Sequence, residues 1–164
     1  MLINEKTKLR TLISAKCYGA DGKLKWNEDI ENLVTDQGAN YLLQSFFATP
    51  NYNPAWYVGL YTGVGTLSTS DTMASHPGWI EVTAYNQLVR PQLIMGTAIN
   101  RSITNGSNTA FFSISSTTNL VGVFSTSSSN KGGADGILYG EAAFGGVQQV
   151  IPSDQLYLTV AFSC

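Results

Sequence analysis

Short apolar runs separated by clusters of glycine, asparagine and serine dominate the chain after residue 54. Runs of this length and spacing are typical of the strands of a β-sandwich or jelly roll. Eight runs are expected to form strands: Ala55 to Tyr61, Ile80 to Tyr85, Gln92 to Met95, Thr109 to Ser115, Val121 to Thr126, Ile137 to Tyr139, Gln148 to Ile151 and Leu156 to Phe162. Every second position from Leu156 to Phe162 is apolar, so this strand should line the core.

Two turns are predicted from residues that tolerate positive φ. Thr11 to Tyr18 and Lys23 to Ile30 flank a turn from Gly19 to Gly22, and this pattern predicts an opening hairpin. A second hairpin turn is expected at Asn105-Gly106, because a type I′ turn needs positive φ at both central positions.

One segment, Asp36 to Ala48, has helical periodicity. Asp36 is expected to cap the helix, and apolar residues recur at helical spacing from Ala39 onward. The following segment, Thr49 to Pro54, contains two prolines and ends the helix. The chain is therefore expected to be an all-β protein with one short helix near residues 36–48.

Charge is concentrated at the start of the chain, because residues 1–36 hold 12 of the 20 charged residues. We interpret residues 1–12 as an N-terminal arm and residues 13–164 as a single β-sandwich domain. A net charge of −2 with only 12% charged residues excludes a basic nucleic-acid binder. No stretch approaches the roughly 20 apolar residues that span a bilayer, so no membrane partner is expected.

The residues offer little for catalysis or for a cofactor. His76 is the sole histidine and lies next to Pro77 and Gly78, where a loop residue is the favoured interpretation over a catalytic base. One histidine and two distant cysteines exclude a structural zinc site. A calcium site at Asp135 or Asp154 stays open, although a glycine-rich turn explains this region better. We expect no enzyme activity and no cofactor.

The first twelve residues lack the apolar core and cleavage site of a secretory signal peptide, so synthesis in the cytosol is expected. The two cysteines, Cys17 and Cys164, permit a single bridge. In a reducing compartment free thiols are the favoured state.

Aromatic residues gather between positions 52 and 85. Trp56 and Trp79 are expected in the core, whereas Tyr52, Tyr57 and Tyr61 are divided between core edge and contact surface. Stacking of carbohydrate on this group is an alternative.

Several short motifs resemble a family of small structural proteins of tailed bacteriophages. The resemblance covers residues 14 to 162, and its most specific part runs from Trp56 to Arg90. It is carried by Lys25-Trp26, Asn32 to Thr35, Gly38, Leu42-Leu43, Trp56 to Leu60, Asp71 to His76, Gly78-Trp79, Glu81 to Tyr85, Arg90-Pro91, Gly122 to Phe124, Gly136 to Gly140, Ala143-Phe144 and Ser153 to Val160. The family's usual Gly-Asp in the last turn is Ser153-Asp154 here.

The resemblance implies a non-enzymatic capsid decoration, or cement, protein with a jelly-roll-like antiparallel β-sandwich. Its implied partners are the major capsid protein and further copies of itself, and its implied location is the head surface of the virion. A tail, collar or fibre-associated protein that binds a receptor or glycan is the alternative.

Contact with the capsid or with other subunits is expected from two groups of residues. The first lies in the arm, where a strand added to a neighbouring sheet is expected, and the second in the aromatic segment. The candidates are Leu2, Ile3, Lys6, Lys8, Arg10, Tyr52, Tyr57, Tyr61, Met73 and His76.

Overall fold

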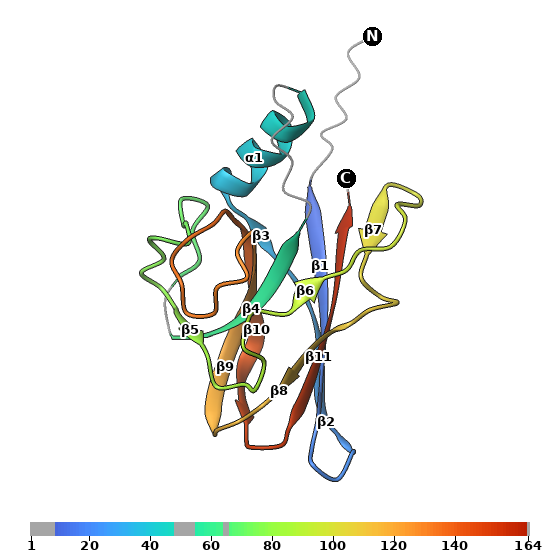
Figure 1. Ribbon diagram of the computed structural model, residues 1–164, viewed down its shortest axis with the longest axis vertical. Helices are drawn as coiled ribbons and strands as arrows, with labels where there is room; N and C mark the ends of the chain where they lie inside the picture. Colours follow the sequence, from blue (N-terminus) through green and yellow to red (C-terminus); the bar gives the residue numbers. More distant parts are fainter. Residues whose placement is uncertain (1–8, 48–54, 64–65, 164) are drawn as a thin grey trace.

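The computed structural model describes residues 9–47, 55–63 and 66–163. These residues form two antiparallel β-sheets packed face to face, with one helix at one end (Figure 1). Sheet A contains β1 (Arg10–Tyr18), β2 (Leu24–Glu31), β7 (Ser102–Thr104), β8 (Ala110–Ser113) and β11 (Gln155–Ser163). Sheet B contains β3 (Leu33–Val34), β4 (Trp56–Thr62), β5 (Ile80–Val82), β6 (Gln92–Leu93), β9 (Thr118–Thr126) and β10 (Leu138–Val150). The all-β sandwich is confirmed.

The opening hairpin and the closing strand follow the predicted pattern. β1 pairs with β2 across the turn at residues 19–22, and Gly22 has φ of 75°. β1 also pairs with β11 along its whole length, from Arg10 opposite Ser163 to Tyr18 opposite Gln155. Leu156, Leu158 and Val160 of β11 are buried, so this strand lines the core as expected.

One long strand replaces two of the predicted runs. Residues 137–139 and 148–151 were expected as separate strands, but Leu138 to Val150 form the continuous strand β10. Its register against β9 shifts between Ala143 and Gln148, so the glycines between them form a bulge and not a turn. Glu28 of β2 accepts a hydrogen bond from Gly145 N at 2.7 Å and fixes this bulge to sheet A.

The hairpin expected at Asn105-Gly106 is wrong. β7 and β8 do not pair with each other, because both run antiparallel to β11 at successive positions. The side chain of Asn105 is buried between them: its Oδ1 accepts from Val160 N at 2.6 Å and its Nδ2 donates to Leu158 O at 3.2 Å. The positive φ values occur instead at Asn100 and Arg101, in the tight turn that precedes β7.

The main core lies between the sheets, and a second, smaller core lies on the outer face of sheet B. Residues 66–79, between β4 and β5, cover this outer face and contribute to the second core. Gly59 faces outward opposite Phe124, and a Cβ there would lie 2.2 Å from the Phe124 ring. The Phe124 ring therefore occupies the space that a side chain at position 59 would fill.

Strand β1 begins at Arg10, so residues 10–12 belong to the sandwich and not to the expected arm. Residues 1–8 lie outside the described residues. Cys17 is a free, buried cysteine, and its burial, with a smaller effect from Asp154, raises the pKa of its thiol to about 11. Cys164 lies outside the described residues.

Candidate interaction surface

Helix α1 (Asp36–Phe47) is attached to the sandwich by its first turn. Thr35 caps it, because the Thr35 hydroxyl accepts from Gly38 N at 3.0 Å and its carbonyl accepts from Ala39 N at 3.0 Å. The expected cap, Asp36, is therefore the first helical residue. The Thr35 hydroxyl also donates to the backbone carbonyl of Leu138 in β10, and this bond ties the helix start to sheet B.

The close approach of α1 to β10 depends on Gly38. A Cβ at this position would lie 2.4 Å from the carbonyl oxygen of Tyr139 and 2.6 Å from its Cα. Because both atoms belong to the backbone, no side-chain movement makes room for a larger residue. Gln37 strengthens the contact by accepting a hydrogen bond from Leu138 N at 2.9 Å.

A row of aromatic side chains continues the contact below the helix. The ring of Tyr41 in α1 lies edge-to-face on Trp56, with centroids 5.7 Å apart. Trp56 contacts Tyr139 at 5.8 Å, and Tyr139 contacts Phe162 of β11 at 5.1 Å. Trp56, expected in the core, is thus half-buried at its edge.

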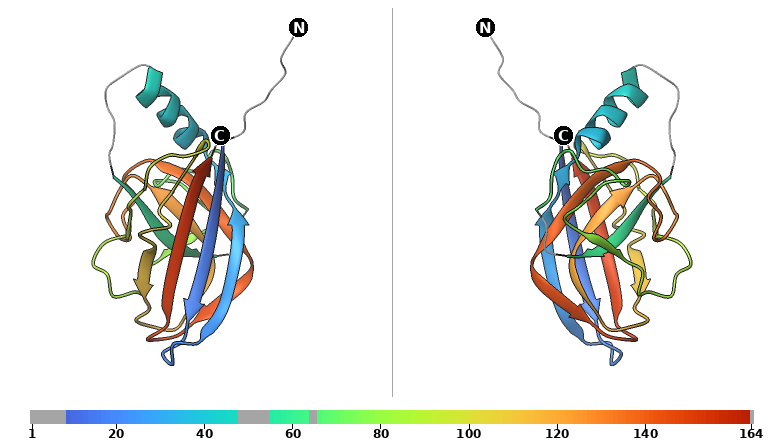
Figure 2. Two further views of the ribbon diagram at one scale, coloured as in Figure 1. Left: turned by 90° about the vertical axis from the view of Figure 1, so that its right-hand side faces the viewer. Right: turned by 90° about the vertical axis from the view of Figure 1, so that its left-hand side faces the viewer.

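The other side of α1 carries exposed leucines. Leu42 is 42% exposed and Leu43 is 55% exposed, although both follow the helical apolar pattern. The helix projects from the sandwich, and the start of β1 and the end of β11 lie at the same end (Figure 2). Leu9 and Leu12, at the start of β1, are also exposed. We call Leu9, Leu12, Leu42 and Leu43 the helix-end leucines.

Charge is scarce in the chain after the start of α1. Residues 37–163 contain eight charged residues, of which five have side chains that are at most 8% exposed. The five are Asp71, Glu81, Arg90, Glu141 and Asp154. The other three are Arg101, Lys131 and Asp135. Most charge in this part of the chain is therefore buried, and the exposed charges of the sandwich are concentrated in the β1–β2 hairpin.

The structure separates the expected contact residues. Arg10 is exposed at the start of β1, and Tyr57 is half-buried in β4. His76 is half-buried and stacks on Trp79, with ring centroids 3.6 Å apart. The remaining arm and loop candidates, Leu2, Ile3, Lys6, Lys8 and Tyr52, lie outside the described residues.

Tyr61 and Met73 are corrections to the expected contact surface. Both are 1% exposed and pack in the second core with Trp79. Tyr61 points to the outer face of sheet B, but the segment at residues 66–79 covers that face. Neither side chain can contact another subunit without opening of this cover. Trp79 is buried, as expected.

Two buried carboxyl groups meet beneath the same cover. Ser68 N donates to Glu141 Oε1 at 3.1 Å and to Asp71 Oδ2 at 3.3 Å, so these oxygens share one donor. Trp79 Nε1 donates to Glu141 Oε2 at 2.7 Å. Burial, with a further contribution from Asp71, raises the pKa of Glu141 to about 7. The sequence offers no local signal for this pair, because Glu141 lies in β10 and Asp71 in a distant loop.

The second buried charged group is the ion pair between Arg90 and Glu81. Arg90 binds both carboxylate oxygens of Glu81, at 2.9 Å from Nε and 2.7 Å from Nη2. It also donates to the carbonyls of Ser128 at 2.9 Å and Gly133 at 2.8 Å. The loop between β9 and β10 is thereby fixed to β5. Glu81 and Arg90 belong to the motifs of the family resemblance, but their pairing was not predicted.

The acidic residues considered for calcium have protein partners. Asp135 accepts from Ser128 Oγ at 2.7 Å and from Asn130 Nδ2 at 3.0 Å. Asp154 pairs with Lys25 and accepts from Ile151 N at 2.9 Å. Within the described residues no group of three or more His, Cys, Asp or Glu side chains is placed to hold a metal ion. No helix in the described ranges has the length and apolar character to cross a bilayer.

No protein-family model matches the chain, and no curated protein matches it.

Proposed function

We propose that this protein is a non-enzymatic bacteriophage structural protein that decorates the capsid and stabilises the lattice of the major capsid protein. The observation that carries the proposal is the set of helix-end leucines. Leu42 and Leu43 lie on the projecting helix, and Leu9 and Leu12 lie at the same end of the sandwich, where contact with another protein removes them from water. The resemblance to phage structural proteins supplies the identity of the partner.

The way α1 is attached suits a docking element. Its first turn is fixed by Thr35 and Gly38, while Leu42 and Leu43 lie farther along the helix and face solvent. An apolar helix face that enters a groove on a partner is a common mode of recognition. The fixed start limits the orientational freedom lost on binding, which reduces the free-energy cost of association.

Repetition explains how modest contacts stabilise a large shell. A subunit that binds only the assembled lattice shifts the equilibrium toward that lattice. If one decoration subunit, or an oligomer of it, bridges neighbouring capsid subunits, each contact raises the effective concentration of the next. Area and shape complementarity then matter more than any reactive group.

The test is rebinding to stripped particles. Phage heads are freed of this protein by mild denaturant, and the purified chain is added back in a sedimentation assay. A Leu42→Ser, Leu43→Ser double variant is expected to bind roughly 100-fold more weakly, since each leucine contributes on the order of 1.5 kcal/mol when buried. Leu88→Ser is the matched control, because Leu88 is 91% exposed in a loop outside the helix end.

Three outcomes decide the proposal. Rebinding of the wild type together with a rise in the melting temperature of the heads supports it. Failure of the wild type to bind the heads contradicts it. Equal binding by the double variant and Leu88→Ser contradicts the docking role of the helix end.

A further inference from the structure

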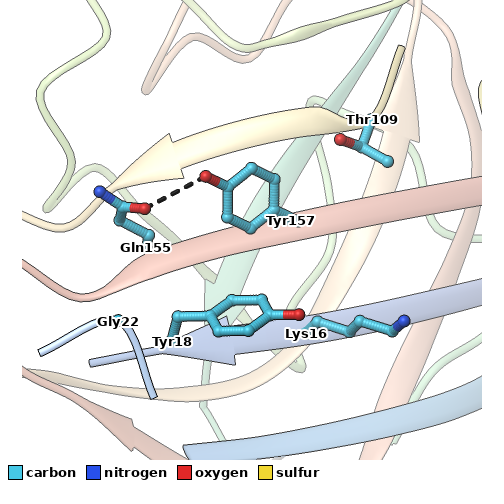
Figure 3. Close-up of a pocket in the computed structure, with 6 residues that line it drawn as sticks. All are labelled: Lys16, Tyr18, Gly22, Thr109, Gln155 and Tyr157. Atoms are coloured by element: carbon cyan, nitrogen blue, oxygen red, sulfur yellow. Dashed lines mark hydrogen bonds between the residues drawn. The ribbon is translucent and has the colours of Figure 1, made fainter. Parts of the chain in front are cut away.

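A shallow hollow of about 390 Å³ lies on the outer face of sheet A. Six residues from β1, the β1–β2 turn, β11 and the segment before β8 line it: Lys16, Tyr18, Gly22, Thr109, Gln155 and Tyr157. Figure 3 shows the rings of Tyr18 and Tyr157 on neighbouring strands, with Gln155 at one end of the hollow and Lys16 and Thr109 at the other.

The pairing register of β1 and β11 sets the positions of the residues around this hollow. Lys16 lies directly opposite Tyr157, and Tyr18 lies directly opposite Gln155. Because alternate residues of a strand face opposite sides, these four side chains share the outer face. The residues between them, Cys17 and Leu156, are fully buried. The core that holds the strands in register thus also fixes the positions of the four outer side chains.

Aromatic packing holds the rings in place. Tyr157 lies edge-to-face with Tyr18 at 5.8 Å and contacts Phe111 of β8 at 5.1 Å. The Tyr157 hydroxyl donates to Gln155 Oε1 at 3.1 Å. Both tyrosines are half-buried, so part of each ring is accessible to a ligand. Fixed rings lose little conformational entropy on binding.

The polar groups around the rings indicate the chemistry of the ligand. The Gln155 amide and the Thr109 hydroxyl exchange hydrogen bonds with hydroxyl groups, which both donate and accept. Lys16 is the one cation in the lining, no carboxylate lines the hollow, and within the described residues Lys16 forms no ion pair. A ligand with apolar faces, several hydroxyls and a carboxylate complements this arrangement. An acidic oligosaccharide has all three features.

We propose that this hollow binds an acidic oligosaccharide, of which one or two sugar units contact the protein. The C–H face of a sugar ring packs on Tyr157 and Tyr18, and its hydroxyls bind Gln155 and Thr109. Lys16 binds the carboxylate. Binding itself does not depend on the assembly role proposed above.

If the assembly role holds, the position of the hollow suits attachment of the particle to a polysaccharide surface. Tyr18 and Gly22 lie at the β1–β2 hairpin, and α1 lies at the opposite end of the sandwich (Figure 1). A subunit docked through its helix end therefore presents the hollow away from the capsid. Many weak sugar contacts on one particle add up to strong attachment to a polysaccharide surface.

The test uses the full chain and two defined probes, tetragalacturonate as the acidic sugar and cellotetraose as the neutral one. Saturation-transfer NMR detects contact, and titration calorimetry gives the dissociation constants. We expect the wild type to bind tetragalacturonate more tightly than cellotetraose. Tyr157→Ala is expected to weaken binding of tetragalacturonate about tenfold, in line with loss of an aromatic contact.

Charge is tested separately, so that a folding defect in Tyr157→Ala does not decide the result. Lys16→Gln should weaken the binding of tetragalacturonate about threefold to tenfold and leave the binding of cellotetraose unchanged. Lys23→Gln is the matched control, because Lys23 is an exposed lysine in the adjacent turn. No binding of either probe overturns the proposal, as does equal loss in Lys16→Gln and Lys23→Gln. Equal affinity of the wild type for the two probes overturns the acidic specificity.

The two proposals fail independently. Leu42→Ser, Leu43→Ser should lose binding to heads and keep binding to tetragalacturonate, whereas Tyr157→Ala should do the reverse. Loss of both activities in one variant contradicts the separation of the two sites.

Discussion

Trp79 donates its indole N–H to Glu141 Oε2 at 2.7 Å, although 62 positions separate the two residues in the sequence. This bond joins the loop that covers sheet B to the sheet itself. Asp71 lies on the other side of Glu141, and the two carboxyl groups share the donor Ser68 N. Because two buried carboxylates repel, the folded state favours a proton on this pair.

The acid pair predicts that stability falls as pH rises. Glu141 has a folded-state pKa of about 7 against an ordinary value of 4.5. Folding therefore favours the protonated form, and this stabilisation is complete below pH 4.5 and is lost as pH rises through 7. The free energy of unfolding, measured with denaturant, should be lower at pH 8 than at pH 5 by an amount on the order of a few kcal/mol.

Glu141→Gln should flatten that decrease, because glutamine keeps an acceptor for Trp79 and carries no titratable proton. His76→Asn is the control, because His76 stacks on Trp79, the donor to Glu141. A pH dependence that survives in Glu141→Gln and disappears in His76→Asn would contradict the assignment to the acid pair.

Removal of Arg90 should lower the free energy of unfolding more than loss of a surface ion pair does. Arg90→Met leaves the Glu81 carboxylate, 8% exposed, without its two-pronged partner. We expect a loss of about 3–5 kcal/mol in urea unfolding. Arg90→Met combined with Glu81→Gln should be less destabilised than Arg90→Met alone, because no unpaired charge is buried. A loss below about 1 kcal/mol, the size typical of exposed pairs, would contradict this account.

Gly38→Ala should displace α1. The added Cβ meets the Tyr139 backbone at 2.4 Å, so the helix must move away from β10. We expect a loss of about 1–3 kcal/mol in stability, with changed fluorescence from Trp56, which contacts Tyr41 of the helix. Asn40→Ala is the control, because Asn40 is exposed on the same helix. Wild-type stability and fluorescence in Gly38→Ala would show that the close approach is unnecessary.

Asn105→Ala tests the side chain that binds β11 in the gap between β7 and β8. Its loss leaves Val160 N and Leu158 O without their side-chain partner in a buried position. We expect destabilisation of about 2–4 kcal/mol, since each buried group left unsatisfied costs about 1–3 kcal/mol. Asn108→Ala should have little effect, because Asn108 is exposed and contributes its backbone carbonyl. Hydrogen exchange at Val160 should quicken in Asn105→Ala, and unchanged exchange would refute the hydrogen bond from Val160 N to the Asn105 side chain.

Binding to the capsid should depend weakly on salt. The helix-end leucines are apolar, and α1 carries one charged residue, Asp36. We expect the dissociation constant for stripped heads to change less than about threefold between 50 mM and 500 mM salt, because screening acts on charge pairs. A steep weakening with salt would show that the charged arm, and not the helix end, dominates the contact.

Local patterns in the sequence predicted the elements well. The hairpin of β1 and β2 was evident from the glycine-rich turn at residues 19–22, and β11 from its alternation. Helix α1 was evident from its spacing and from the prolines after it, although Thr35 and not Asp36 caps it. In each case the deciding interaction lies within a few residues along the chain.

Long-range pairing was not predictable from the same patterns. The glycines at 145–146 resemble a turn, but pairing with β9 and the contact with Glu28 make them a bulge in β10. The sequence predicts Tyr61 as a contact residue, but residues 66–79 cover it. The Leu42 and Leu43 pattern indicates a buried helix face, yet Gly38 and Tyr41 provide the contact with the sandwich.

The most direct measurement is a reconstruction of the intact phage particle at side-chain resolution. The account predicts density for this sandwich on the head surface, repeated with the capsid lattice, with Leu42 and Leu43 buried against the major capsid protein. Density confined to the tail or collar, or a lattice-bound subunit whose helix end faces solvent, would contradict it.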